Sequence, residues 1–333
     1  MRASIASEPR DRKRAGEAAR ESACRGVRGA KPLGRRMSRA VIVCLIVVAG
    51  AGASARQAKE SSPEAKAAFD CGRAAHNARK TDEAVRCFER AVELDPTSSL
   101  YHLWLGHAYT RQLSSAGFLR KPLIARRSGE AYNMAVKLDP TNVDAAEARI
   151  DFFLGAPGIV GGGVDKARAE AARLATLDVY RGGMAAGRIA EHEKQWPEAE
   201  RLYRGLLTDY PDRTVALDAL LTLLQNARRF DEAFTIVDDR LARLPDETAS
   251  LYNLGRLSAI SGQQLARGET ATRRFLTLTT GDPVRQSNAH YRLGMIKERM
   301  GDVRAAAAEY QTALELYPRH EPAAAALKKI QGR

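Results

Sequence analysis

From about residue 65 onward, apolar residues recur at intervals of three and four, the spacing that places them on one face of an α-helix. Near the C-terminus, Ala306, Tyr310 and Ala313 share such a face. Pro318 ends this helix, because proline has no amide hydrogen for the next helical hydrogen bond. Runs that alternate apolar and polar residues, typical of β-strands, are missing. The pattern predicts an all-α chain.

Prolines recur at the ends of similar phrases: AVELDP (91–96), AVKLDP (135–140), LLTDYP (206–211), RLARLP (240–245) and ALELYP (313–318). A spacing of roughly 30 to 40 residues is typical of helical hairpins stacked in an array. We expect about seven hairpins followed by a capping helix that carries Lys328 and Lys329 and covers the open end. The expected repeats are 65–98, 99–142, 143–179, 180–213, 214–247, 248–286 and 287–320, with the cap in 321–333.

Small residues in the first helix of a hairpin are matched by alanines in the second. These pairs are Gly72 with Ala84, Gly187 with Ala199, and Gly294 with Ala306. An aromatic position in the second helix is filled by Phe88, Tyr132, Tyr203, Phe275 and Tyr310. This pattern resembles the tetratricopeptide-repeat (TPR) family over nearly the whole of residues 65–320.

Two positions depart from the family's pattern: Val179 replaces the usual proline of the third unit, and Leu221 replaces the glycine of the fifth. Because of these departures, the sequence places the repeat positions of units three to five only to within one or two residues. The resemblance implies a right-handed superhelical solenoid whose first helices line a concave groove. It also implies a non-catalytic scaffold that binds a peptide or protein segment in that groove.

Three hairpins are longer than the minimal repeat, with extra residues around 113–124, 156–163 and 262–268. All three insertions are expected between the first and second helix, so that stacking would place them along one edge of the solenoid. This edge could belong to the binding face. Alternatively, the insertions are tolerated growth of permissive turns.

The formal net charge of +13 is concentrated at the N-terminus, where residues 1–55 hold 12 Lys and Arg but only 4 Asp and Glu. The remainder has mixed charge, which does not indicate nucleic-acid binding. Residues 40–55 are uncharged, follow Arg39 and end in Ala53-Ser54-Ala55. A basic flank, a short apolar core and a small-x-small exit are typical of a secretory signal peptide.

We therefore expect a signal peptide in 37–55, a linker in 56–64 and the solenoid in 65–333. Residues 1–36 form an unusually long basic extension, and synthesis could start at Met37. The chain looks like a bacterial exported TPR protein, periplasmic or secreted. The alternative is an uncleaved apolar helix at 41–48 that anchors an assembly factor in the inner membrane.

Cys71 and Cys87 are the two cysteines outside the leader, one on each helix of the first hairpin. The hairpin turn near Lys80 places them at similar heights. An oxidising compartment would allow a disulfide between them. The alternative is two free thiols that pack as small apolar side chains.

No pattern for catalysis, a cofactor or a metal site is present. The glycines at 161–163 lack the lysine of a phosphate-binding loop, and we interpret them as an expanded turn with positive φ. The six histidines include no His-Glu-x-x-His pair. Asp144, Glu147 and Asp151 share a helical face but spread over about 10 Å, which indicates a solvated acidic patch in the groove.

The register predicts which side chains face the groove: Phe69, Arg73, His76, Leu103, His107, Asp144, Glu147, Asp151, Met184, Arg188, Tyr252, Asn253, Arg256, Tyr291, Arg292 and Met295. Of these, we expect Tyr252, Arg256, Tyr291, Arg292, Arg188, Phe69 and Arg73 to contact the partner, since tyrosine and arginine dominate such interfaces. Alternatively, these side chains only keep one face of the helix array in contact with water and bind no partner. Asp218 and Thr222 stand where a chaperone-tail clamp needs lysine and asparagine, which excludes that ligand.

Overall fold

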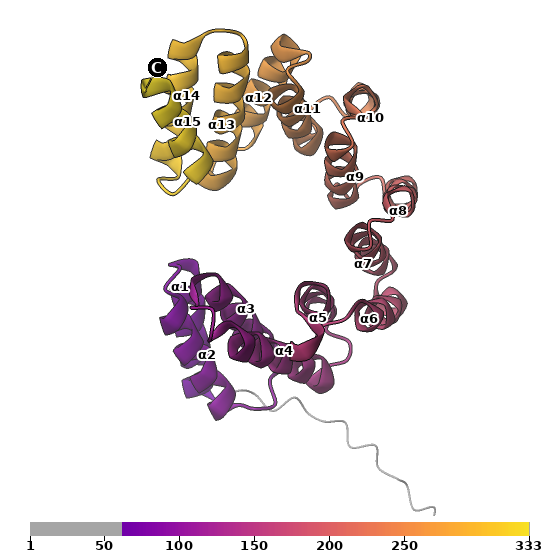
Figure 1. The fold of residues 1–333 in the computed structure, drawn as a ribbon, viewed down its shortest axis with the longest axis vertical. Coiled ribbons are helices and arrows are strands. Elements are labelled where there is room, and N and C mark those ends of the chain that lie inside the picture. Colours follow the sequence, from indigo (N-terminus) through magenta and orange to yellow (C-terminus); the bar gives the residue numbers. More distant parts are fainter. Residues whose placement is uncertain (1–61, 333) are drawn as a thin grey trace, which may run out of the picture. The chain divides into compact units, whose positions relative to one another are not determined.

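The structure is a computed structural model that describes residues 62–332. These residues form fifteen α-helices and one short 3-10 helix, with no β-strand in the described range (Figure 1). The helices are α1 (Pro63–Asn77), α2 (Thr81–Leu94), α3 (Ser99–Ser115), α4 (Lys121–Leu138), α5 (Val143–Gly155), η1 (Gly158–Val160), α6 (Val164–Leu177), α7 (Val179–His192), α8 (Trp196–Asp209), α9 (Val215–Asn226), α10 (Phe230–Arg243), α11 (Thr248–Ser261), α12 (Leu265–Leu278), α13 (Pro283–Arg299), α14 (Val303–Leu316) and α15 (Glu321–Gln331).

The helices α1–α14 form seven consecutive hairpins, and α15 packs on α14 as a cap. The predicted all-α solenoid is confirmed. Helix α1 begins at Pro63, inside the predicted linker. The predicted extension, signal peptide and start of the linker lie outside the described residues.

The first helices of neighbouring hairpins contact one another: α3 touches α5, α5 touches α7, α9 touches α11, and α11 touches α13. Within the described range, no two successive second helices pack as closely. The first helices therefore lie on the inner side of the curved stack, as Figure 1 shows for α5, α7 and α9 against α6, α8 and α10. A concave face lined by first helices follows from this packing.

Polar side chains fix where most first helices begin. The residue before the helix accepts a hydrogen bond from a backbone amide of the first turn, which satisfies a donor that has no helical partner. The capping residues of α1, α3, α5, α7 and α13 are Ser62, Ser98, Asn142, Asp178 and Asp282. These caps repeat the same local signal along the stack.

Tight turns join the two helices of most hairpins. Each contains a residue in the left-handed region: Arg79 (φ 58°), Lys194 (φ 60°), Arg228 (φ 57°) and Gly301 (φ 85°) in the first, fourth, fifth and seventh hairpins. In the long third turn, Gly161 (φ 106°) and Gly163 (φ 148°) have positive φ. The interpretation of this glycine run as an expanded turn is confirmed.

An aromatic ring of the second helix packs directly over the glycine of the first. A Cβ atom added to Gly187 would lie 2.3 Å from Tyr203, and one added to Gly72 would lie 2.5 Å from Phe88. The same arrangement holds for Gly106 and Gly294, which face Tyr132 and Tyr310. The ring thus comes closer to the glycine than the matched alanine does, and the alanines are themselves buried.

The sixth hairpin differs from this arrangement. Gly255 faces the Thr272 hydroxyl rather than a ring. Phe275 lies one turn later and contacts Tyr252, with ring centroids 5.3 Å apart. The prediction that Phe275 fills the repeated aromatic position is therefore wrong in register by about one turn.

The three long segments have different structures. In the second hairpin, most of 113–124 extends α3 and α4, and only 116–120 lie between them. In the third, 156–163 form a long turn that contains η1. In the sixth, only 262–264 separate α11 from α12, so the predicted insertion at 262–268 is wrong. The extra length of that repeat lies in α13, which has 17 residues.

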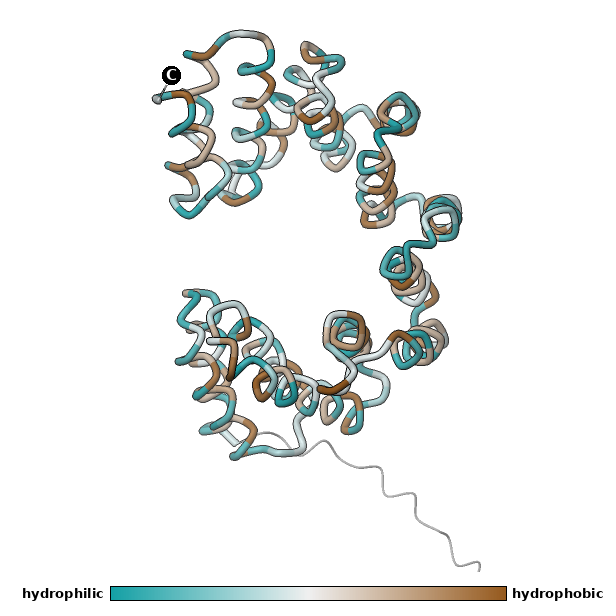
Figure 2. Tube along the Cα trace, viewed as in Figure 1, coloured by the Kyte–Doolittle hydropathy of each residue, from teal (hydrophilic) through white to brown (hydrophobic). Residues whose placement is uncertain are grey.

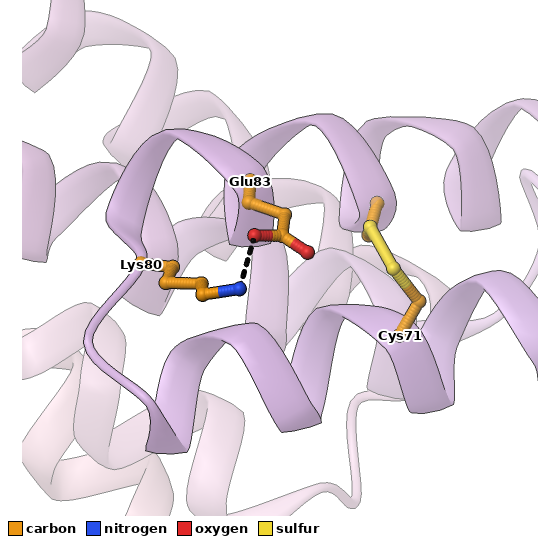
Figure 3. Close-up of a disulfide and its surroundings, with 4 residues drawn as sticks. Cys71, Lys80 and Glu83 are labelled. Atoms are coloured by element: carbon orange, nitrogen blue, oxygen red, sulfur yellow. Dashed lines mark ion pairs between the residues drawn. A yellow bond between two sulfur atoms is a disulfide. The ribbon is translucent and has the colours of Figure 1, made fainter.

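A disulfide joins Cys71 on α1 to Cys87 on α2, with the Cα atoms 5.9 Å apart (Figure 3). Cys71 is exposed and Cys87 is half-buried, so the bond lies at the surface of the hairpin. Nearer the turn, Lys80 and Glu83 form an ion pair at 3.2 Å. The first hairpin therefore has a covalent cross-link between its helices.

Most residues buried between the helices are apolar. Hydrophobic and hydrophilic positions alternate along each helix (Figure 2). The largest core cluster runs through α7–α13 and includes Tyr203, Leu221, Phe234 and Phe275. None of the helices in residues 62–332 combines the length and apolar character that a membrane span requires.

Candidate protein-binding groove

On the five first helices that carry the repeat glycine, the groove-facing position is the residue that follows it. These residues are Arg73, His107, Arg188, Arg256 and Met295, all of them half-buried or exposed. A residue three places before the glycine lies on the glycine's own face, toward the second helix. This difference separates the predicted groove residues into two groups.

Three predicted groove residues belong to the core instead. Phe69, Leu103 and Met184 are 7%, 4% and 5% exposed, and each lies three residues before a repeat glycine. The Phe69 ring stacks on Tyr101 with centroids 4.9 Å apart and lies 5.7 Å from Phe88. The prediction that Phe69 contacts a partner is therefore wrong, since its ring is enclosed by the first two hairpins.

Tyr252 and Tyr291 occupy the same position on α11 and α13 but remain half-buried. The Tyr252 ring packs 5.3 Å from Phe275. The Tyr291 ring lies 5.8 Å from Tyr310 and 5.0 Å from His320. Each tyrosine therefore has one side against the core and only part of its surface available to a ligand.

Arg256 lies on α11, one turn after Tyr252. Its Nη1 donates to Thr222 Oγ1 on α9 at 3.0 Å. Its Nε and Nη2 are buried and find no acceptor among the described residues. Burial lowers the pKa of the Arg256 guanidinium, while Asp218 raises it. The group is therefore a cation whose hydrogen-bonding capacity is only partly used.

Arg292, on the neighbouring helix α13, is in a similar state. Its Nη1 contacts Met295 Sδ at 3.3 Å, and its buried Nε has no acceptor in residues 62–332. The guanidinium carbon lies 5.1 Å from the centroid of the Tyr291 ring. Two arginines on adjacent first helices thus present unpaired donors beside two tyrosines.

Asn253 does not face the groove. It is 1% exposed, and its Nδ2 donates to Asp218 Oδ1 at 2.6 Å and to the Ala249 carbonyl at 2.9 Å. The bond to Asp218 holds α11 against α9, whereas the bond to Ala249 lies within α11, so the prediction of a groove-facing Asn253 is wrong. Asp218 is engaged in this contact between helices.

The carboxylates on α5 form ion pairs with arginines on α7. Arg181 on α7 bonds Asp144 and lies 3.3 Å from Glu147. Arg188 lies 3.8 Å from Glu147 and 3.4 Å from Asp151. Burial raises the pKa of Glu147, against the lowering effect of both arginines. Asp144 and Asp151 are solvated, as predicted, with side chains 69% and 62% exposed. The prediction missed that the patch forms ion pairs with Arg181 and Arg188 on α7.

Trp104 is a groove residue that the sequence analysis missed. It is half-buried, and its ring lies 6.1 Å from Phe69, 5.4 Å from His76 and 5.9 Å from His107. The exposed Arg73 guanidinium lies 6.0 Å from the centroids of both Phe69 and Trp104. Trp104 lies two residues before Gly106, just as Arg292 on α13 lies two residues before Gly294. This shared position could have identified Trp104 as a groove residue.

A pocket of about 580 Å³ lies where the second and third hairpins meet, next to the long turn 156–163. His107 and Asp151, both predicted groove residues, line it together with residues of α4. In the described range, no group of three or more His, Cys, Asp or Glu side chains is placed to hold a metal ion. The site thus comprises a groove along the first helices and a pocket at its N-terminal half.

Stacked helical hairpins with a groove along their first helices define a helical-repeat solenoid. The tetratricopeptide repeat model matches residues 65–98 and 287–320, the first and last hairpins. A comparison with curated protein sequences gives no match. The chain is a tetratricopeptide-repeat protein, and such repeats generally mediate protein–protein interaction without catalysis.

Solved structures share the fold. A tetratricopeptide repeat protein from Parabacteroides merdae is 15% identical with a TM-score of 0.50, and the alignment covers 81% of this chain and 100% of that one. Yeast Tom70 is 12% identical with a TM-score of 0.59, covering 82% of this chain and 57% of that one. YrrB, described as a TPR protein with an unusual peptide-binding site, is 14% identical with a TM-score of 0.36, covering 72% and 97%. At these identities the likeness concerns the fold alone.

Proposed function

We propose that this chain is a non-catalytic scaffold that binds a peptide or protein segment in its concave groove. The C-terminal half of the groove supplies the anchors, with Arg256 and Arg292 as donors and Tyr252 and Tyr291 as amphipathic surfaces beside them. Tyrosine and arginine carry much of the binding energy at protein interfaces. The leader pattern and the Cys71–Cys87 disulfide support work outside the cytosol, since such bonds persist in oxidising compartments.

The unpaired donors of Arg256 and Arg292 are the observation that carries the proposal. A buried N–H without an acceptor destabilises a fold by about 1–3 kcal/mol. Three such donors on neighbouring helices are therefore favourable sites for acceptors that come from outside the described residues. Backbone carbonyls and carboxylates of a polypeptide segment are suitable acceptors, because they offer oxygens at regular spacing.

A double substitution of both arginines by leucine tests this proposal. We expect Arg256→Leu with Arg292→Leu to weaken capture of the partner from the native host by roughly thirtyfold or more, since a lost anchor weakens binding by about 2 kcal/mol. The melting temperature should stay the same or rise, because unpaired buried donors are removed. Arg86→Met, an exposed arginine on α2, is the matched control and should leave capture unchanged.

The arginine pair is a cleaner test than the tyrosine pair. Tyr252→Ala with Tyr291→Ala should also reduce capture, but both rings pack against buried aromatic residues and their loss lowers stability. If every partner captured by the native chain is captured equally by the double leucine variant, the binding face is not this groove.

A further inference from the structure

The pocket between the second and third hairpins has walls from four segments. Leu113 belongs to α3, Pro122 to α4, Phe152 to α5 and Val160 to the long turn. These walls are apolar. The volume of about 580 Å³ is within the range of sites that bind small ligands or several side chains.

The floor of the pocket is polar and internally hydrogen-bonded. Thr110 Oγ1 lies 2.7 Å from Ser128 Oγ and 3.0 Å from the Tyr132 hydroxyl. The same hydroxyl lies 3.1 Å from His107 Nδ1. Burial lowers the pKa of His107, so its imidazole is neutral near pH 7. The floor thus offers uncharged groups that can both donate and accept.

The rim of the pocket has exposed apolar side chains and two charged residues, Lys121 and Asp151. Asp151 lies 3.4 Å from Arg188 Nε, which offsets its charge. Ile159, in the long turn 156–163, lines the pocket and is 92% exposed. Phe118 and Leu119 precede the rim residue Lys121 in the chain and are 85% and 90% exposed. Lys121 lines the mouth, is exposed, and forms no ion pair within residues 62–332. Large apolar side chains exposed around a concave site indicate an interaction surface.

We propose that this pocket binds a tyrosine side chain of the partner polypeptide, with an acidic residue of the same segment beside Lys121. This proposal rests on the proposed function, because it takes the ligand to be a polypeptide, and it adds a second contact point to the groove. A tyrosine has an apolar ring for the walls and a hydroxyl that donates and accepts at the floor. The volume leaves room for a neighbouring side chain under the rim.

The polar floor argues against a plain hydrocarbon as occupant. The hydroxyls of Thr110 and Tyr132 already bond one another, and an acyl chain or a leucine would add no further hydrogen bond to them. A phenol can bond to the lone pairs that these hydroxyls have left. Lys121, which has no ion-pair partner in residues 62–332, then favours an acidic residue next to the tyrosine.

Small probes test the pocket without the natural partner. We would titrate the full-length chain with N-acetyl-Glu-Tyr-amide and follow binding by NMR. N-acetyl-Glu-Phe-amide lacks only the hydroxyl and should bind about two- to tenfold more weakly, as expected for one lost hydrogen bond. N-acetyl-Lys-Tyr-amide should bind about two- to fivefold more weakly, as expected for an exposed charge contact.

A filled pocket provides the matched variant. Gly155 lines the pocket, and a Cβ atom added there meets nothing within 4 Å, so Gly155→Phe can place a ring in the pocket without a backbone clash. Gly205 on α8 is equally open and distant from the pocket, and Gly205→Phe is the control. We expect at least about tenfold weaker binding of the Glu-Tyr probe to the first variant and no change in the second, with unchanged helical signal in both.

Three results would overturn the proposal: no binding of the Glu-Tyr probe, equal binding of all three probes, or equal binding to both glycine variants. A fourth would be co-sedimentation with anionic phosphatidylglycerol vesicles that is lost in Phe118→Ser, which would assign the rim to a lipid surface. None of these results affects the groove proposal. The groove is tested by Arg256 and Arg292, which lie on other helices.

Discussion

At the scale of single residues, the hairpins are built on complementary sizes. Four hairpins place an aromatic ring over a glycine. In the fifth, Leu221 takes the glycine position and the smaller Val237 takes the position of the ring, and both are fully buried. In the third, Ile150 and Ala171 occupy the same two positions. A large residue on one helix is thus matched by a smaller one on the other, which preserves packing density.

This complementarity predicts opposite effects for two alanine substitutions in the fourth hairpin. Gly187→Ala places a Cβ atom 2.3 Å from the Tyr203 ring and should lower the free energy of unfolding by about 1–3 kcal/mol. Gly205→Ala meets no neighbouring atom within 4 Å and should raise it by about 0.5–1 kcal/mol, since alanine favours the helix. Urea unfolding followed by circular dichroism measures both. Equal effects at the two sites would contradict this account.

At the scale of helices, the sequence was sufficient for the hairpins but not for every turn. The helical spacing and the prolines predicted the pairs correctly. The sixth turn was misplaced because Gly262 and Gly268 were both taken as turn residues. Gly262 has φ 80° and does lie in the turn, whereas Gly268 lies inside α12, where a Cβ atom would be 2.3 Å from Ser258. A glycine needed for close packing looks the same in a sequence as one needed for a turn.

The groove residues were misassigned for a related reason. One position along a helix rotates the side chain by about 100°. The predictions for Leu103 and Met184 placed buried residues in the groove, whereas Trp104, one position further, does lie there. Repeat spacing fixes which helix lines the groove. It does not show which residues of that helix face the groove, unless they are counted from the glycine that packs against the second helix.

The disulfide leads to a prediction for the first hairpin. Titration of free thiols in unfolded, non-reduced protein from the native host should find none. Cross-linking residues separated by 16 positions stabilises a fold by about 3 kcal/mol, mainly by restricting the unfolded chain. Cys71→Ala with Cys87→Ala should therefore increase amide exchange in α1 and α2 and leave α9 and α10 unaffected, because repeats pack mainly against their neighbours. Two titratable thiols would show that the bond does not form.

At the scale of the whole molecule, the pocket could not have been predicted from the sequence. The sequence showed that the second and third hairpins are long, and stacking implied that their turns lie on one edge. The pocket depends on more than this, because α3 and α4 are extended while the third hairpin has a long turn with η1. Lengthened helices beside a lengthened turn leave a space between them, and a sequence does not distinguish the two kinds of insertion.

Export is the prediction for the chain as a whole. We expect cleavage between Ala55 and Arg56, since this bond follows the small-x-small triplet directly after the apolar run. Mass spectrometry of the N-terminus of protein from the native host measures it. Ala55→Leu should block processing, whereas Arg56→Lys should not. A mature chain that still begins at Met1 or Met37 would contradict cleavage and favour the anchored alternative.

Leu221 has a mechanical consequence. With leucine at the glycine position, α9 and α10 share by far the smallest contact of the seven hairpins. A solenoid behaves as a spring, and its elastic response is set by the coupling within and between its turns. The two helices of the fifth hairpin lie further apart than those of the others, so we expect bending under load to be concentrated there. The hairpins before and after the fifth would then move apart or together as two stiffer units. The groove between them could accommodate bound polypeptides of different thickness with little strain in the other hairpins.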